Sequence, residues 1–294
     1  MTFARDTLIG DPDRLPRLPG WVTSRRAETL EDVAFLSGAA LAQLHIVLSR
    51  NDVPHALLRD RLALRAAEAC VTFSGRPERA GELRDAWHLL RPDDLPGPAG
   101  EVYLSWRRAA ERPVSIKALH RALPETAPEQ IAMALDAGQG APVARAAMAL
   151  EAVLTQAPRA EVSGLILADA ALAQALGWDH LLPVLAGGLK RADLRKRGDD
   201  LRLACHRAVT ASGLEATRLA ADLARRAAHL KSVAPKLRAK GAGEAVAIFL
   251  TRDAVAPAAL PLPDRAARRL CERLVDLGAV RELSGRDTFR LYGV

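Results

Sequence analysis

The spacing of apolar residues predicts helices along most of the chain. In the first long segment they recur every three or four positions, as at Val33, Leu36, Leu44 and Leu48, which is the period of one helical face. This spacing continues, interrupted by prolines and glycines, to about residue 230. Alternation typical of a strand begins only at residue 279. The pattern therefore predicts a mainly α protein.

Prolines, glycines and capping residues set the limits of the expected helices. The segment 160–176 is nearly all apolar, which predicts a central buried helix. Asp169 interrupts this segment, and its length falls short of a membrane span. The helices expected before residue 240 cover about 30–48, 52–73, 77–90, 101–111, 115–123, 128–137, 143–156, 160–176, 199–211 and 214–230.

Changes in pattern divide the chain into three parts. Residues 1–26 are interrupted by prolines and show no helical period, so we expect an extended N-terminal arm. Residues 27–240 form the expected helical body, with a candidate sub-boundary near 138–160. Residues 241–294 differ in pattern and are expected to form a winged-helix-like domain.

The last part has the element order of a winged helix-turn-helix. A short helix at 244–251 is followed by a Pro- and Ala-rich segment and then by a basic helix, which begins near Asp264 and ends before Gly278. Two short β-forming runs across a Gly-containing turn predict a hairpin. The expected fold is therefore mainly α: a multi-helical body with a C-terminal winged helix-turn-helix carrying a small β-hairpin.

The basic helix is expected to bury one face and to present arginines on the other. Counted from Arg265 at about 100° per residue, its apolar positions fall between about 120° and 200°. They are Ala267, Leu270, Leu274 and Leu277. A helix with arginines opposite such a stripe fits the major groove and reaches phosphates and guanine edges, and a wing adds contacts. The candidate nucleic-acid-binding residues are Arg265, Arg268, Arg269, Arg273, Arg281, Arg286 and Arg290.

The same residues permit a protein–protein interaction module with no nucleic-acid activity. Glu272 and Asp276 stand three or four positions from arginines of the basic helix and could pair with them. Winged-helix folds of this size also bind proteins. In either case we expect the helical body to form a homodimer or to receive a protein partner.

Most of the positive excess lies in the last part of the chain. The net charge is +7, and residues 230–294, with 12 Lys/Arg against 7 Asp/Glu, hold +5 of it. Such an excess permits contact with double-stranded DNA. Hydrophobic residues make up 49% of the chain, which suffices for a buried core, and the aromatic content of 4% is low for a β-rich protein.

Cysteine placement and the N-terminal residues indicate a cytoplasmic protein. Cys70, Cys205 and Cys271 are widely spaced within helical patterns, which argues against a disulfide framework or a zinc site and fits a reducing compartment. Near the N-terminus, Asp and Pro stand where a signal peptide needs an apolar stretch. We expect no contact with a membrane.

The sequence contains no recognisable catalytic motif, and we expect neither an enzyme nor a metal or cofactor. It lacks the HExxH, CxxC, Walker and GxGxxG patterns. Cys205 and His206 point about 100° apart on a helix, which is unfavourable for a nucleophile and its base. Asp179 and His180 suit a helix N-terminus, and only a pocket that joins them to Asp169 would favour an enzymatic site.

Three segments resemble an uncharacterised bacterial family, domain of unknown function 1403. They are RLPGW, ADAALAQALGWDHLLPVLAGGLKRADLR and DRAARRLCERLVDLGAVRELSGRDTFRLYGV. The resemblance covers nearly the whole chain and implies no reaction, cofactor or catalytic residue.

The final segment also resembles the helix-turn-helix of Fic-like N-terminal proteins. That resemblance implies a DNA-binding tail behind a helical body. It implies no AMP transfer, because the His-Pro-Phe motif of a catalytic Fic domain is missing from this sequence. The expected function is DNA binding in regulation or replicon maintenance.

Overall fold

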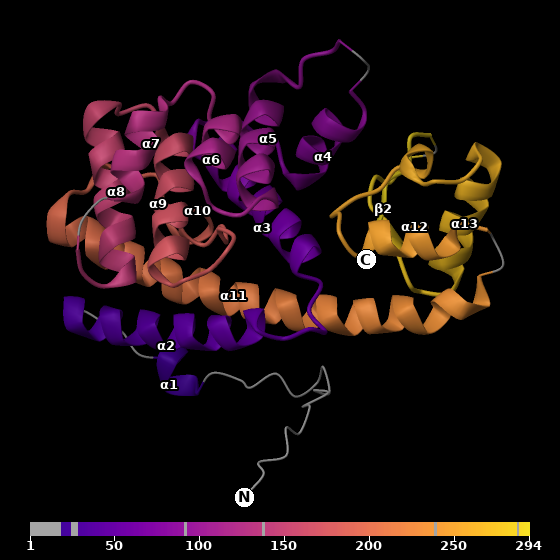
Figure 1. The fold of residues 1–294 in the computed structure, drawn as a ribbon, viewed down its shortest axis with the longest axis horizontal. Coiled ribbons are helices and arrows are strands. Elements are labelled where there is room, and N and C mark those ends of the chain that lie inside the picture. The colour runs from indigo at the N-terminus through magenta and orange to yellow at the C-terminus, as the bar shows by residue number, and fades with distance from the viewer. Residues whose placement is uncertain (1–18, 25–28, 91–92, 137–138, 238–239, 287) are drawn as a thin grey trace, which may run out of the picture.

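The computed structural model describes residues 19–24, 29–90, 93–136, 139–237, 240–286 and 288–294. These residues form thirteen α-helices, short 3-10 turns and one two-stranded antiparallel sheet near the C-terminus. The mainly α fold expected from the sequence is confirmed. The helices divide between a larger body and a smaller C-terminal tail, residues 240–294, and the long helix α11 runs beneath both (Figure 1).

Helix α11 (Gly198–Val233) is the longest element, with 36 residues. The sequence predicts a break in it near residues 212–213, and that prediction is wrong. Gly213 is buried and faces Ala40, so that a Cβ added to Gly213 would lie 3.6 Å from the Ala40 Cβ. Packing between helices here outweighs the weak helix propensity of glycine, because propensity is a small term beside tertiary contact.

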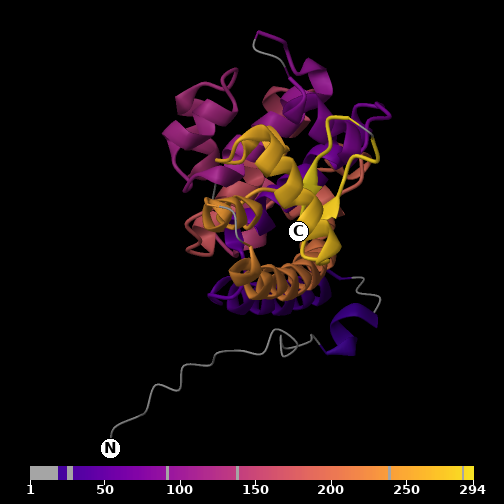
Figure 2. The ribbon, with the colours of Figure 1, turned by 90° about the vertical axis from the view of Figure 1, so that its right-hand side faces the viewer.

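Helix α2 (Leu30–Leu48) lies alongside α11 at the base of the molecule (Figures 1 and 2). By length and composition alone this helix could cross a membrane. Its buried face includes Val33, Leu36, Leu44 and Val47 and packs on α11, which accounts for much of its apolar composition. Across this contact the Ser37 hydroxyl lies 2.7 Å from Nδ1 of His206.

The rest of the body packs above these two helices, with its core formed mainly by leucine and alanine (Figure 1). The nearly all-apolar segment forms a buried helix, as expected, and Asp169 within it accepts hydrogen bonds from the backbone N–H groups of Val184 and Leu185. The remaining body helices are α3 (His55–Phe73), α4 (Ala80–His88), α5 (Gly97–Glu111), α6 (Ile116–Ala122), α7 (Pro128–Leu135), α8 (Pro142–Gln156), α9 (Glu161–Ala175) and α10 (Leu185–Gly188), with the 3-10 turn η2 (Asp193–Arg195).

The expected N-terminal arm contains a short helix, α1 (Gly20–Ser24), where the sequence predicts none. Val22 is buried, and the Trp21 ring stacks on Phe35 of α2 with 5.4 Å between ring centroids. The stacking of Trp21 on Phe35 places this helix against α2, and no periodic pattern is needed for so short a helix. Residues 1–18 and 25–26 of the arm lie outside the described residues.

The tail contains α12 (Ala242–Phe249), α13 (Asp264–Asp276), β1 (Arg281–Glu282) and β2 (Tyr292–Gly293). The expected hairpin is present but short, with Arg281 opposite Gly293 and Glu282 opposite Tyr292. Between α12 and α13 the described chain forms the 3-10 turn η4 (Pro257–Ala259) rather than an α-helix. The prolines of this segment lack the N–H groups that an α-helix requires. A winged helix-turn-helix is therefore not shown.

Replacing Gly188 with Ala should destabilise the protein. A Cβ at this position would lie 2.5 Å from the backbone oxygen of Ala208 in α11, so α10 would have to move. We expect the free energy of unfolding to fall by about 1–3 kcal/mol, as for other overpacked sites. Urea denaturation followed by far-ultraviolet circular dichroism measures this change.

Gly38→Ala is the matched control, because a Cβ added to this exposed position of α2 meets no heavy atom within 4 Å. This variant should gain about 0.5–1 kcal/mol from the better helix propensity of alanine. Equal denaturation midpoints for Gly188→Ala and the wild type would show that α10 and α11 are not in this close contact.

Candidate functional site

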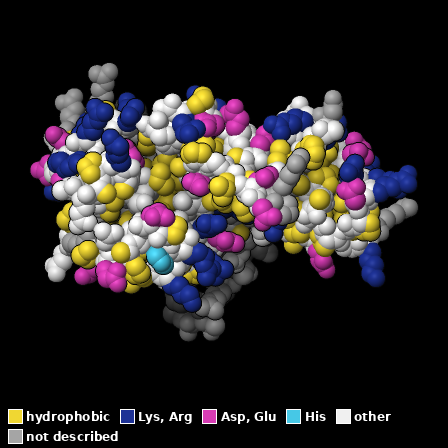
Figure 3. All heavy atoms as spheres, turned by 90° about the horizontal axis from the view of Figure 1, so that it is seen from above, with side chains coloured by type: hydrophobic (Ala, Val, Ile, Leu, Met, Phe, Trp, Pro, Cys, Tyr) yellow, Lys and Arg dark blue, Asp and Glu magenta, His cyan; other side chains and the backbone are white. Residues whose placement is uncertain are grey.

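The outer surface of α13 carries the arginines that the sequence singled out. Arg265, Arg268, Arg269 and Arg273 are all exposed. The predicted apolar stripe is buried at Ala267, Leu270 and Leu274 and half-buried at Leu277. In Figure 3, Lys and Arg side chains project from the tail end of the molecule. The structure thus brings these four arginines together on one free helical surface, which we call the α13 face.

Three exposed carboxylates, those of Asp264, Glu272 and Asp276, lie on or beside the α13 face, and one of them forms an ion pair there. Arg268 pairs with Asp264 at 3.0 Å, and both side chains are more than 60% exposed, so this pair is weak. The other three arginines have no ion-pair partner among the described residues. Glu272 and Asp276 are exposed as well, and neither forms an ion pair with an arginine of the described helix.

The hairpin arginines face different surroundings. Arg286 forms an ion pair with Asp85 of α4 in the body. Partial burial, followed by the charge of Arg226 on α11, lowers the pKa of Arg281. Arg290 donates from Nε to the backbone oxygen of Arg286 at 3.0 Å. The surroundings of these three arginines therefore differ from those of the α13 face, and their contact with nucleic acid stays a prediction.

A buried ionic cluster joins the tail to the body. Asp253, which is fully buried, forms ion pairs with Arg61 of α3 and Arg84 of α4. Its backbone N–H donates to Asp60 at 2.8 Å, and Asp60 pairs with Arg107 of α5 at 3.1 Å. Desolvation raises the pKa of Asp253, but the charges and hydrogen bonds of Arg61 and Arg84 outweigh this effect and hold it below its usual value.

Two further hydrogen bonds cross the same boundary. Arg61 donates from Nη2 to the backbone oxygen of Val294 at 3.3 Å, and His229 of α11 donates from Nε2 to the backbone oxygen of Leu277 at 3.0 Å. Sequence reasoning missed this cluster, because Arg84 and Asp253 are 169 positions apart and no motif links them. The cluster fixes how the α13 face is presented relative to the body.

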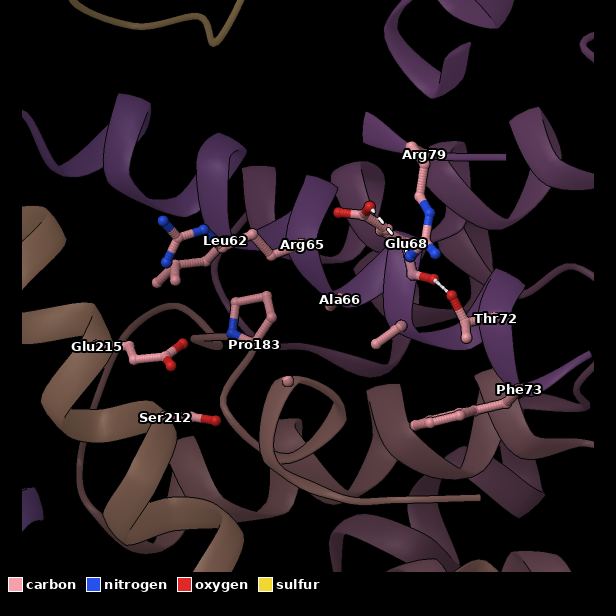
Figure 4. A pocket seen from close by; sticks show the side chains of 12 residues that line it. Leu62, Arg65, Ala66, Glu68, Thr72, Phe73, Arg79, Pro183, Ser212 and Glu215 are labelled. Carbon is pink, nitrogen blue, oxygen red and sulfur yellow. Dashed lines mark hydrogen bonds and ion pairs between the residues drawn. The ribbon is translucent and has the colours of Figure 1, made fainter. Parts of the chain in front are cut away.

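The body contains a cavity of about 450 Å³ between α3, α10 and α11. Figure 4 shows Arg65 and Glu215 on one side of it and Phe73 on the other. Arg79 pairs with Glu68 at 3.8 Å along the rim. Charges of both signs surround an apolar floor, so this cavity has no consistent preference for an anion or a cation.

A sequence model of a family described as protein of unknown function, DUF1403, matches residues 6–294. The chain belongs to this family. The DUF1403 match includes the body and the tail, so both belong to one family unit. It lends no support to the resemblance between the tail and Fic-like proteins. No curated protein matches the chain.

The polar residues that could favour an enzymatic site do not converge in this DUF1403 chain. Asp169 is buried in α9 with a strongly raised pKa caused by desolvation, whereas Asp179 and His180 line a surface cleft that Asp169 does not reach. Burial raises the pKa of Cys205 to about 12, which keeps this thiol protonated at neutral pH. Within the described part of the chain, no group of three His, Cys, Asp or Glu residues could hold a metal ion.

Asp253→Asn should destabilise the DUF1403 chain, because it leaves Arg61 and Arg84 buried without their common counter-ion. We expect the free energy of unfolding at pH 7 to fall by about 3–5 kcal/mol. Asp264→Asn is the control, since it removes one exposed carboxylate and should cost less than about 1 kcal/mol. Similar losses in both variants, measured by urea denaturation, would contradict a stabilising role for the buried cluster.

The same variant should change the response to acid. The pKa of Asp253 is lowered in the folded protein, so its contribution is complete above the unfolded pKa of about 4 and is lost as the pH falls through the lower folded value. The free energy difference between wild type and Asp253→Asn should therefore shrink between about pH 5 and pH 2. A constant difference over this range would contradict the assignment.

Proposed function

We propose that this protein binds double-stranded DNA through the α13 face, in a regulatory or replicon-maintenance role. The observation that carries the proposal is the set of four exposed arginines on one side of a 13-residue helix, three of them without an ion-pair partner among the described residues. Arginine suits both phosphates and guanine edges, because its planar guanidinium donates two parallel hydrogen bonds.

The connectivity of the tail supports a reduced winged helix. Val255 forms an antiparallel bridge with Tyr292, so residues before α13 join the edge of the small sheet beside β2. The order is then α12, a bridging residue, η4, α13, β1 and β2, in which η4 takes the place of the second helix of a helix-turn-helix. In such folds the helix that precedes the hairpin enters the major groove. In this protein α13 precedes the hairpin and would be the helix that enters the groove.

The hairpin would act as the wing beside α13. Phe289 is 74% exposed and stands next to the exposed Arg290. Arg286 would have to exchange Asp85 for a phosphate. The side chain of Arg286 is 47% exposed and that of Asp85 is 19% exposed, so the exchange would leave a largely buried carboxylate without its counter-ion.

A protein partner is the second candidate for the same face. Glu272 and Asp276 lie between the arginines, at about 340° and 20° around the helix when Arg265 is set at zero. Both are exposed. Alternating charges suit a protein surface of complementary pattern, whereas DNA would repel the two carboxylates.

Arg268→Ala/Arg269→Ala should weaken binding to a labelled duplex of mixed sequence. If both residues contact phosphates, the slope of log affinity against log salt should become shallower by about 1.8, because each phosphate contact contributes about 0.9. Fluorescence anisotropy titrations at low and physiological salt measure affinity and slope together.

Lys117→Ala/Arg121→Ala removes the same charge from exposed positions of α6 in the body. This control should bind the duplex as the wild type does. Equal binding by the wild type and the α13 variant would refute the DNA proposal and favour the protein partner. Equal weakening of both variants would show a general charge effect rather than a defined interface.

A further inference from the structure

A second surface of the body has the chemistry of an anion site and is separate from the α13 face. It is a cleft of about 300 Å³ between the end of α2, the start of α3 and the loop that follows α9. Its polar lining includes His45, His55, Arg59, Asp179 and His180, and the ring of Trp178 lies among them. We call it the Arg59 cleft.

Arg59 is a cation without a counter-ion among the described residues. Its one hydrogen bond there runs from Nε to the backbone oxygen of Ala110 at 3.0 Å, near the end of α5. The partial negative charge of that helix end offsets some of the arginine charge. The other N–H groups of the guanidinium have no acceptor among the described residues, and burial lowers the pKa of Arg59.

Other partly buried arginines of α3 and α5 have a counter-ion, unlike Arg59. Arg61 and Arg107, on the same helix and on α5, each form an ion pair with a buried or nearly buried aspartate. Withdrawing a cation from water without an anion is unfavourable, and a bound anion would remove this cost.

The histidines of the cleft differ in the donors that they can offer, because His55 already donates from Nε2 to the backbone oxygen of Arg50 at 2.8 Å. Nδ1 of His45 accepts from Nε1 of Trp178 at 3.0 Å, which leaves the N–H on Nε2 of His45. His180 lies near Arg59. Desolvation, and after it the charge of Arg59, lowers the pKa of His180, while Asp179 opposes the change.

Asp179 limits the anions that fit. Its side chain is exposed, so solvent screens its charge, but it still disfavours a large polyanion at the rim. Leu48, Leu182 and Trp178 supply apolar contact for the remainder of a ligand. A compact group with one oxyanion matches both the charge and the volume of the cleft.

We infer that the Arg59 cleft binds the oxyanion group of a small molecule, a carboxylate or a phosphate, with Arg59 as its charged anchor and His180 as a neighbouring donor. This site does not depend on the proposed contact of α13 with DNA.

Two probes separate the two kinds of oxyanion: inorganic phosphate and benzoate, the second of which also tests the apolar wall. Each is titrated at millimolar concentration into the full chain, and the fluorescence change is assigned with Trp178→Phe. We expect at least one probe to bind saturably to the wild type. The fluorescence change that reports this binding should be absent in Trp178→Phe. The stronger probe identifies the class of ligand. Absence of saturable binding for both probes overturns the inference.

Arg59→Gln should weaken binding of the stronger probe at least tenfold and leave duplex binding unchanged. Arg65→Gln, on the same helix but lining the other cavity, is the matched control and should bind the probe as the wild type does. Equal affinity in Arg59→Gln and the wild type overturns the inference, and so does an equal loss in Arg65→Gln.

Two further variants keep the test decisive if Arg59→Gln lowers the melting temperature. Arg59→Lys keeps the charge and should retain part of the binding, whereas His180→Gln should weaken it several-fold at an unchanged melting temperature. Wild-type affinity in His180→Gln would overturn the role of His180 as a donor to the anion.

Discussion

Close packing of small side chains along α11 holds the architecture together. The buried face of this helix is rich in alanine, with Ala204, Ala208, Ala216 and Ala220 among its contacts, and Gly213 lies at its centre. Small side chains allow backbones to approach closely, as Gly188 does at Ala208. With few aromatic residues to fill space, close approach is how this chain reaches the packing density of a protein interior. The positions of α2 and of α10 follow from this surface.

The tail is attached in a different way. Its contacts with the body include the buried pairs of Asp253 with Arg61 and Arg84, and hydrogen bonds to backbone oxygens of Leu277 and Val294. Hydrogen bonds and ion pairs are directional, so they determine an orientation as well as a contact. For a protein whose proposed interface lies on α13, this orientation decides which other surfaces a long ligand could reach at the same time.

Arginine serves three purposes in this molecule, and its surroundings separate them. Arg61 and Arg84 are buried counter-ions that join tail and body. The arginines of the α13 face are exposed and available to an anionic polymer. Arg59 is partly buried and unpaired among the described residues, in a cleft suited to a small anion. In the sequence, the arginines of all three groups carry the same positive charge, so a count of charges does not distinguish their purposes.

The sequence by itself determined most of the helices and many of their limits, the short hairpin and the division of α13 into a buried stripe and a basic side. These features depend on periodicity and on turn residues, which act over a few positions. Only the tertiary structure decided that α11 is continuous, that a 3-10 turn forms in the Pro- and Ala-rich segment before α13, and which arginines are paired. Arg286 meets Asp85 across 201 positions, and Arg84 meets Asp253 across 169. Such contacts follow from the packing of whole helices, and no local pattern encodes them.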